Sequence, residues 1–415
     1  MHRHHFPILL LALLVPGWAA AQQGLGSALR QGVGGVIDGL TDLVPLERIS
    51  PVQAARDLAA ARIDRLSAFV RQNREAIAFD DRGNPSVRGI VLVAGAPDEA
   101  ISAIRSAGYG VEQDSIEGLD IAFARVTLPA GTDLSKAMQH IRKLAPGAEV
   151  SADTVYFASG LTPANNGKLA GAGPAGIGAI GLIDGGVAAH PVLSGRIEQR
   201  GFAKGAPMPS SHGTAVASLI VGKGETTGSA PGAPLLVADI YGNDKAGGGA
   251  LAIARALGWM ASRRVSIVTV SLVGPANPLL GRAVDQALSR GMRIVAAVGN
   301  DGPAAPPPYP ASYLGVIAVT GVDGRNRVLI EAGRPKHLDY AAPGADMRAA
   351  RATGGVMRVR GTSFAAPLVA GRLYQLRNVP KPLSALDAEA IDLGAKGPDT
   401  VFGRGLICGK CRNRL

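Results

Sequence analysis

The chain has 415 residues, of which 47% are apolar and only 4% aromatic, with 56 glycines. This length allows two or three domains, and the composition favours close-packed layers of helices and strands over an aromatic-lined binding surface. The formal net charge is +11, but Lys and Arg are scattered and form no dense basic run with interleaved aromatic residues, which argues against nucleic-acid binding.

Residues 1–21 have the features of a cleavable signal peptide. Arg3 lies among three histidines, an apolar run covers residues 6–15, and residues 19–21 are alanines suited to cleavage. The apolar run is too short to span a bilayer, and no later stretch is long and apolar enough to do so. We therefore expect a secreted or periplasmic protein with no membrane span.

Residues 22–86 are expected to form an N-terminal extension that is mainly one helix, over 51–78. Ser50 can cap this helix, and Pro51 suits its first position. Apolar residues then recur at helical spacing, namely Ala54, Leu58, Ile63, Leu66 and Val70. The sequence indicates no function for this helix.

Residues 87–158 are predicted to form a compact α+β unit. Its elements follow the order βαββαβ, which is typical of a ferredoxin-like fold. The strands are expected at 89–94, 110–114, 120–128 and 148–157, and the helices at 97–106 and 134–144. Residues 159–176 are rich in Gly, Asn and Ala without periodicity, so we interpret them as a linker or a cleavable junction.

In residues 177–407 strands alternate with helices, which predicts an α/β unit with a parallel sheet covered by helices on both faces. The strands are expected at 178–183, 235–240, 265–271, 293–298 and 316–320, and the helices at 212–221, 248–262, 278–290 and 362–377.

Four polar residues lie at ends of these elements. Asp184 ends a buried strand, His212 enters an apolar helix, Asn300 follows another strand, and Ser363 begins a helix whose free N–H groups could hold an anion. Each has an ordinary alternative as a strand end, a turn or a helix cap. Together, however, they supply the orienting carboxylate, base, oxyanion donor and nucleophile that acyl transfer needs.

The surrounding motifs resemble those of the subtilisin-like serine proteases, including the order Asp, His, Ser along the chain. The resemblance covers residues 176–407. The motifs that carry it are Ile183-Asp184, Ser211-His212-Gly213-Thr214, Gly299-Asn300-Asp301-Gly302 and Gly361-Thr362-Ser363-Phe364-Ala365-Ala366-Pro367, with Phe402-Gly403-Arg404-Gly405 similar to the closing motif.

The resemblance implies a doubly wound, mainly parallel subtilisin-like sheet and a role for each motif. Ser363 would be the nucleophile, His212 the acid and base, Asp184 the orienting carboxylate and Asn300 an oxyanion donor. Substrate would bind as an added strand along Ser271, Leu272 and Gly274.

The resemblance also makes the unit at 87–158 a propeptide that assists folding and inhibits the enzyme until it is cleaved, with the junction between Phe157 and Pro174. The expected partners are therefore polypeptide substrates and the chain's own propeptide.

No cofactor is required by this mechanism, and no metal ligand is predicted. Family members often bind calcium near residues 222–228, but this loop is short here, so calcium is compatible with the sequence without a clear motif. In the C-terminal tail, 408–415, Cys408 and Cys411 are expected to form a disulfide in an oxidising compartment. A zinc site would need two more ligands, and a redox dithiol would need a thioredoxin-like setting.

The sequence therefore predicts a secreted serine endopeptidase made as a propeptide-inhibited zymogen. The alternative is a latent or non-enzymatic interaction protein that retains its propeptide. A lipase-like hydrolase is disfavoured because Gly-x-Ser-x-Gly is absent around Ser363. The residue preferred before the cleaved bond and the physiological substrate are not fixed by the sequence.

Overall fold

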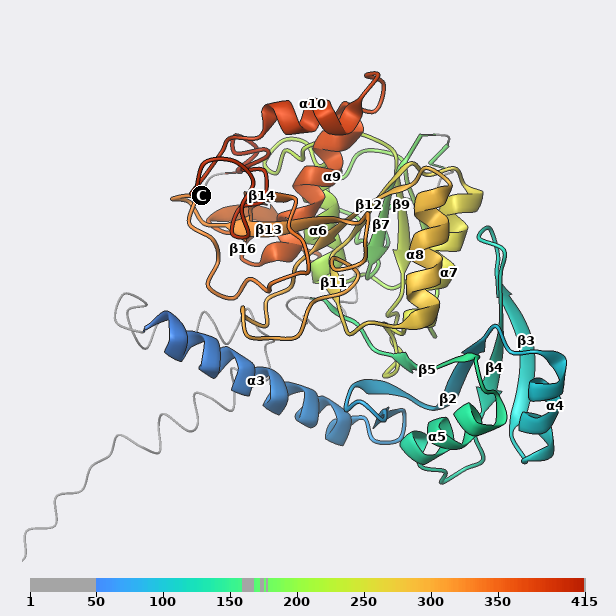
Figure 1. Ribbon diagram of the computed structural model, residues 1–415. Helices are drawn as coiled ribbons and strands as arrows, with labels where there is room; N and C mark the ends of the chain where they lie inside the picture. The colour runs from blue at the N-terminus through green and yellow to red at the C-terminus, as the bar shows by residue number, and fades with distance from the viewer. Residues whose placement is uncertain (1–49, 159–167, 172–174, 177, 414–415) are drawn as a thin grey trace, which may run out of the picture.

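The computed structural model describes residues 50–158, 168–171, 175–176 and 178–413. The predicted signal peptide and most of the predicted linker lie outside these residues. The described chain contains a long helix, α3 (Pro51–Gln72), an α+β unit and a larger α/β unit (Figure 1).

Helix α3 begins as predicted, with the Ser50 side chain accepting a hydrogen bond from the Gln53 N–H. The predicted end at residue 78 is wrong, because Asn73 ends the helix: both its N–H and its side-chain amide donate to the Phe69 carbonyl. The residues beyond it form strand β1 (Ile77–Phe79), which pairs antiparallel with the start of β2 (Pro85–Ala94).

The α+β unit has the predicted ferredoxin-like strand order, β5–β2–β4–β3, in an antiparallel sheet. Its further elements are α4 (Asp98–Ser106), β3 (Gly110–Ile116), β4 (Ile121–Thr127), α5 (Leu134–Leu144) and β5 (Glu149–Thr154). Val91 and Val93 pack under α4 and α5, whereas Leu92 and Ala94 point to the opposite face, toward the larger unit. The last predicted strand, 148–157, is divided, because its end forms β6 (Phe157–Ala158) and pairs with the larger unit.

In the described residues, seven strands form the parallel sheet of the larger unit, in the order β14–β13–β12–β10–β7–β9–β8. The strands are β7 (Ile180–Asp184), β8 (Ile197–Gly201), β9 (Leu235–Asp239), β10 (Ile267–Val270), β12 (Arg293–Ala297), β13 (Ile317–Val322) and β14 (Tyr340–Pro343). The sequence predicted the five central strands, whose apolar runs reflect burial on both faces. It missed β8 and β14, which form the two edges.

Helices cover both faces of this sheet. Helices α6 (Ser211–Val221) and α9 (Ala366–Gln375) share one apolar cluster with the sheet, and α7 (Ala250–Ser262) and α8 (Pro278–Ser289) share the other. The predicted helix at 362–377 is divided, because a 3-10 turn, η2 (Thr362–Phe364), precedes α9. Smaller elements complete the unit, namely α10 (Pro382–Glu389), β11 (Leu272–Val273), β15 (Met347–Ala350) and β16 (Val356–Val359).

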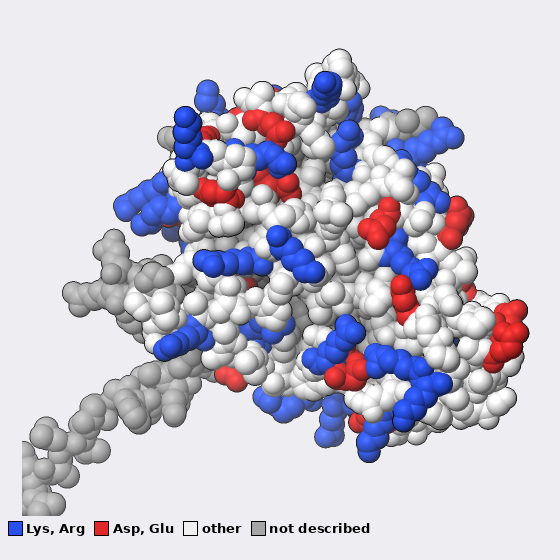
Figure 2. Space-filling model, viewed as in Figure 1, with Lys and Arg blue, Asp and Glu red and all other residues white. Residues whose placement is uncertain are grey.

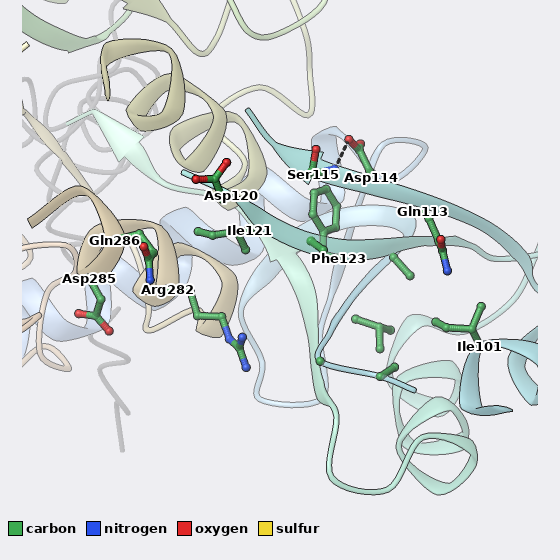
Figure 3. Close-up of a pocket in the computed structure, with 15 residues that line it drawn as sticks. Ile101, Gln113, Asp114, Ser115, Asp120, Ile121, Phe123, Arg282, Asp285 and Gln286 are labelled. Carbon is green, nitrogen blue, oxygen red and sulfur yellow. Dashed lines mark hydrogen bonds between the residues drawn. The ribbon is translucent and has the colours of Figure 1, made fainter. Parts of the chain in front are cut away.

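The sheet of the α+β unit docks on α7 and α8, and the two units share one apolar cluster (Figure 1). Ion pairs join Arg282 to Glu149, Arg290 to Asp120, and Arg255 to Asp114. Between the sheet and α8 runs an open cleft of about 850 Å³, with Arg282, Asp285 and Gln286 on one side and Phe123 on the other (Figure 3). Its lining includes none of the residues predicted to be catalytic, so the cleft belongs to the docking surface.

Asp153 of the α+β unit caps helix α7. The residue before that helix, Gly249, has no side chain to cap it, and the Asp153 carboxylate accepts the Leu251 N–H at 2.9 Å instead. Burial at this interface raises the pKa of Asp153 from 3.8 to about 6, although the Leu251 N–H and nearby arginines oppose the rise.

The predicted disulfide between Cys408 and Cys411 is confirmed. Within the described ranges, no three His, Cys, Asp or Glu side chains gather as a metal site would require. None of the helices described has both the length and the apolar character needed to cross a membrane. On the face shown in Figure 2, Lys and Arg are spread over the surface with Asp and Glu between them.

Candidate active site

Asp184 and His212 form a buried pair at the carboxyl end of the interior strand β7. Both carboxylate oxygens of Asp184 lie 2.9 Å from His212 Nδ1. Asp184 is fully buried, and His212 lies in the first turn of α6, which Ser210 caps. The Nε2 atom of His212 is buried and makes no hydrogen bond with the described part of the chain. The pair is thus arranged with one ring nitrogen fixed and the other available for proton transfer.

A second carboxylate, Asp239, ends the neighbouring strand β9 directly beside Asp184. Burial raises the pKa of Asp239, with Asp184 adding to the rise, while N–H groups of Met208, Tyr241 and Gly242 oppose it. By accepting hydrogen bonds from the N–H groups of Tyr241 and Gly242, Asp239 fixes the loop that follows β9. Nothing in the local sequence singles out this residue.

Ser363 and Asn300 meet at the turn that precedes α9. Asn300 Oδ1 accepts the Thr362 N–H at 3.0 Å, which leaves the Nδ2 end of the amide as a donor. A Cβ atom on Gly361 would lie 2.5 Å from Asn300 Nδ2 and 3.6 Å from Ser363 Oγ, so both groups border the same small space. The ring of Phe364 packs on His212, with centroids 5.4 Å apart, and ties this turn to the Asp184–His212 pair.

The predicted substrate strand has three distinct parts. The Ser271 hydroxyl is buried and donates to the Ser363 carbonyl at 3.0 Å, so this side chain supports the turn that carries Ser363. Leu272 lies in β11. The Gly274 N–H and carbonyl pair with Tyr309, so the peptide groups of Gly274 are not open to an added strand. Gly274 instead makes room for the Tyr156 ring, because a Cβ atom at this position would lie 2.6 Å from that ring.

The chain's own residues 155–158 lie along this strand. β6 pairs antiparallel with β11, with Ala158 opposite Leu272 and Phe157 opposite Val273. On the other side, the Tyr156 N–H donates to the Gly248 carbonyl at 2.8 Å, and Val155 bridges Gly249. The segment is therefore a middle strand between two edges of the larger unit. The predicted helix 248–262 includes Gly248 and Gly249 at its start, whereas α7 begins at Ala250. A run of glycines before a helix carries no signal that is specific to strand pairing.

Tyr156 and Tyr241 fix this segment further. The Tyr156 ring is fully buried, and its hydroxyl donates to the Pro275 carbonyl. The Tyr241 hydroxyl donates to the Tyr156 carbonyl at 2.9 Å. Burial raises the pKa of both phenols well above the ordinary value, with Asp184 adding to the rise at Tyr241, so both remain donors.

Comparison with known proteins agrees with this arrangement. The family model described as "Subtilase family" matches residues 178–392, slightly more than half of the chain. The chain belongs to the subtilase family. Because this family consists of serine peptidases of the subtilisin type, the chain is assigned to that class of peptidase.

Curated subtilases align with the same region. Subtilisin BL of Lederbergia lenta is 34% identical over 200 residues, covering 46% of this chain and 73% of that protein. Subtilisin DY of Bacillus licheniformis is 30% identical over 244 residues, covering 55% and 88%. The minor extracellular protease Epr of Bacillus subtilis is 31% identical over 241 residues, but this chain covers only 37% of its length.

Solved structures show the subtilase fold beyond the family match. Fervidolysin from Fervidobacterium pennivorans, described as a keratinolytic enzyme related to subtilisin, has a TM-score of 0.62 at 20% identity, covering 79% of this chain and 61% of that one. The epidermin leader peptide processing protease EpiP of Staphylococcus aureus has a TM-score of 0.58 at 16% identity, covering 77% and 96%. Both alignments cover more of this subtilase than the family model does.

Proposed function

We propose that this subtilase is an endopeptidase that hydrolyses peptide bonds through an acyl-enzyme, and that it is made as a zymogen. The observation that carries the proposal is the strand at residues 155–158, which is hydrogen-bonded on both sides as an extended polypeptide substrate would be. One of its partners, β11, directly follows Ser271, whose hydroxyl donates to the Ser363 carbonyl.

The reaction follows from the arrangement of the side chains. Ser363 Oγ attacks the carbonyl carbon while His212 Nε2 takes the hydroxyl proton, and Asp184 stabilises the imidazolium that forms. The oxyanion accepts hydrogen bonds from Asn300 Nδ2 and the Ser363 N–H. His212 then gives its proton to the leaving amine, and water hydrolyses the ester by the same route in reverse. These steps need only groups of the chain, the Ser363 main-chain N–H included, together with water.

Two features support the role of residues 87–158 as an inhibitory propeptide. The unit covers α7 and α8 and caps α7 with Asp153, so it stabilises two helices of the larger unit. It also ends in residues 155–158, which fill the groove between β11 and residues 248–249. We place the processed bond directly after this strand, within the predicted junction.

Secretion is part of the proposal. It is supported by the predicted signal peptide at residues 1–21 and by the Cys408–Cys411 disulfide, since disulfides persist mainly in oxidising compartments. One relative, Epr, is named an extracellular protease.

The test is to treat the purified full-length protein with a fluorophosphonate probe beside Ser363→Ala, and then to measure intact masses. We expect labelling in the wild type alone, together with a product that begins shortly after Ala158. If neither protein is labelled and both keep residues 22–158, the alternative of a latent interaction protein with a retained propeptide holds.

A further inference from the structure

Helix α3 lies outside both the α+β unit and the family match, and the function proposed above gives it no role. Its contacts, however, lead to the rim of the active site. We propose that α3 is a second inhibitory element, which docks on Asp301 beside the oxyanion asparagine and closes that side of the groove in addition to β6. This inference rests on the zymogen proposed above.

One face of α3 carries the contacts that support this role, with the larger unit and with β6. Leu58 packs against Gly302, where a Cβ atom added to the glycine would lie 3.0 Å from the leucine side chain. Further along the helix, Phe69 stacks edge-on against Phe157 of β6, with ring centroids 5.1 Å apart. The helix therefore reaches from the loop that carries Asn300 to the strand that fills the groove, and Figure 1 shows it running along that side of the larger unit.

Between these two apolar contacts, Arg62 and Arg65 converge on one carboxylate. Arg62 Nε lies 3.1 Å from Asp301 Oδ2, and Arg65 Nη2 lies 2.6 Å from Asp301 Oδ1. All three side chains are 21–24% exposed, so water screens the pairs only in part. Each oxygen has its own guanidinium, which fixes the helix in register as well as in place.

Asp301 lies next to the candidate oxyanion donor in the sequence. It directly follows Asn300, whose side chain accepts the Thr362 N–H next to Ser363. The ion pairs therefore anchor α3 one residue from the candidate oxyanion donor, and in our proposal the helix moves away before a substrate approaches this side of the site. Asp301 without α3 would be a lone carboxylate at the rim, which attracts cationic groups, and the two arginines occupy that position in the zymogen.

The ion pairs of Arg62 and Arg65 with Asp301, which we call the clamp, also slow the release of the inhibitory segment after one peptide bond is cleaved. Helix α3, the α+β unit and β6 belong to one covalent segment, so cleavage after Ala158 leaves every inhibitory contact joined to the others. The cut segment then holds the enzyme at two places on the groove and dissociates more slowly than β6 alone would.

The test uses the full-length chain and two matched double variants. Arg62→Ala/Arg65→Ala removes the clamp. Arg56→Ala/Arg71→Ala removes two exposed arginines from the same helix, so net charge and helix propensity change equally. The readout is the rate at which a fluorophosphonate probe labels the freshly purified protein. We expect the clamp variant to be labelled about tenfold faster than wild type, which corresponds to about 1.4 kcal/mol, and the control variant to match wild type.

Added salt provides an independent check. It should accelerate labelling of wild type and of the control more than labelling of the clamp variant. All three proteins keep the ion pairs of the α+β unit with α7 and α8, but only the first two also keep the pairs with Asp301. In a Ser363→Ala background, hydrogen exchange should show lost protection in α3 alone, which separates release of the helix from unfolding of the α+β unit.

The outcomes distinguish the clamp from the function on which it rests. Equal labelling rates in all three active proteins would overturn the clamp and leave the zymogen intact. A chain that is never labelled, even after its N-terminal segment is removed, would overturn the proposed protease and the clamp together.

Discussion

Asp153 should make docking of the α+β unit depend on pH. Its pKa is about 6 in the docked chain, against an ordinary value of 3.8. The docked state therefore binds the proton more tightly than the released state. The contribution of Asp153 to docking is therefore fully present below about pH 4 and is lost as the pH rises through about 6. It amounts to about 3 kcal/mol for two pKa units at ~1.36 kcal/mol each, or about a hundredfold.

Replacement with asparagine isolates this effect. Asp153→Asn keeps an oxygen that can accept the Leu251 N–H but removes the titrating group. Trp259, the only tryptophan after residue 21, lies in α7 and reports on this helix by its fluorescence. We would follow urea unfolding by this signal in the Ser363→Ala chain between pH 4 and 7.

The parent chain should lose stability across this range, and Asp153→Asn should lose markedly less. Identical pH profiles in the two proteins would refute the reasoning, and so would docking that strengthens as the pH rises.

Three further predictions concern the groove and the oxyanion site. Asn300→Ala should lower kcat by about 10²- to 10³-fold with little change in KM, as measured by peptide hydrolysis, because it removes a donor used in the transition state. Gly361→Ala should also inactivate the enzyme, since its Cβ would lie 2.5 Å from Asn300 Nδ2 at a φ of +138°, and a fully active variant would contradict this geometry. Tyr156→Ala should release the groove strand at a cost of about 3–5 kcal/mol, seen as earlier probe labelling, whereas Tyr156→Phe loses only the bond to Pro275 and should stay close to wild type.

The candidate site could be predicted from sequence because its parts are local. Asp184, His212 and Ser363 each lie in a short motif at the end of a strand or the start of a helix, and the parallel sheet brings such ends together. The βαββαβ order of the α+β unit was equally accessible, because short apolar strands such as 89–94 and 120–128 alternate with helical segments along the sequence. These features need no knowledge of distant contacts.

The features that could not be predicted from the sequence are those defined by contacts between residues far apart in the chain. The edge strand β8 contains Glu198, Gln199 and Arg200, so its apolar pattern is too weak to mark a strand without its partner β9. Strand β6 is defined only by its pairing with β11. The ion pairs of Arg62 and Arg65 with Asp301 join positions 239 and 236 residues apart, so nothing near α3 could have indicated its place.

The apolar cluster shared by the two units has a consequence for the enzyme after maturation. Leu92, Ile121 and Phe123 of the α+β unit pack in the same cluster as α7 and α8. When the unit departs, the faces of these two helices that it covered meet water. Exposed apolar patches of this kind promote association between proteins. If the proposed cleavage removes the unit, the remaining protein should therefore be more prone than its precursor to self-association at high concentration, and the uncovered faces of α7 and α8 could receive another partner.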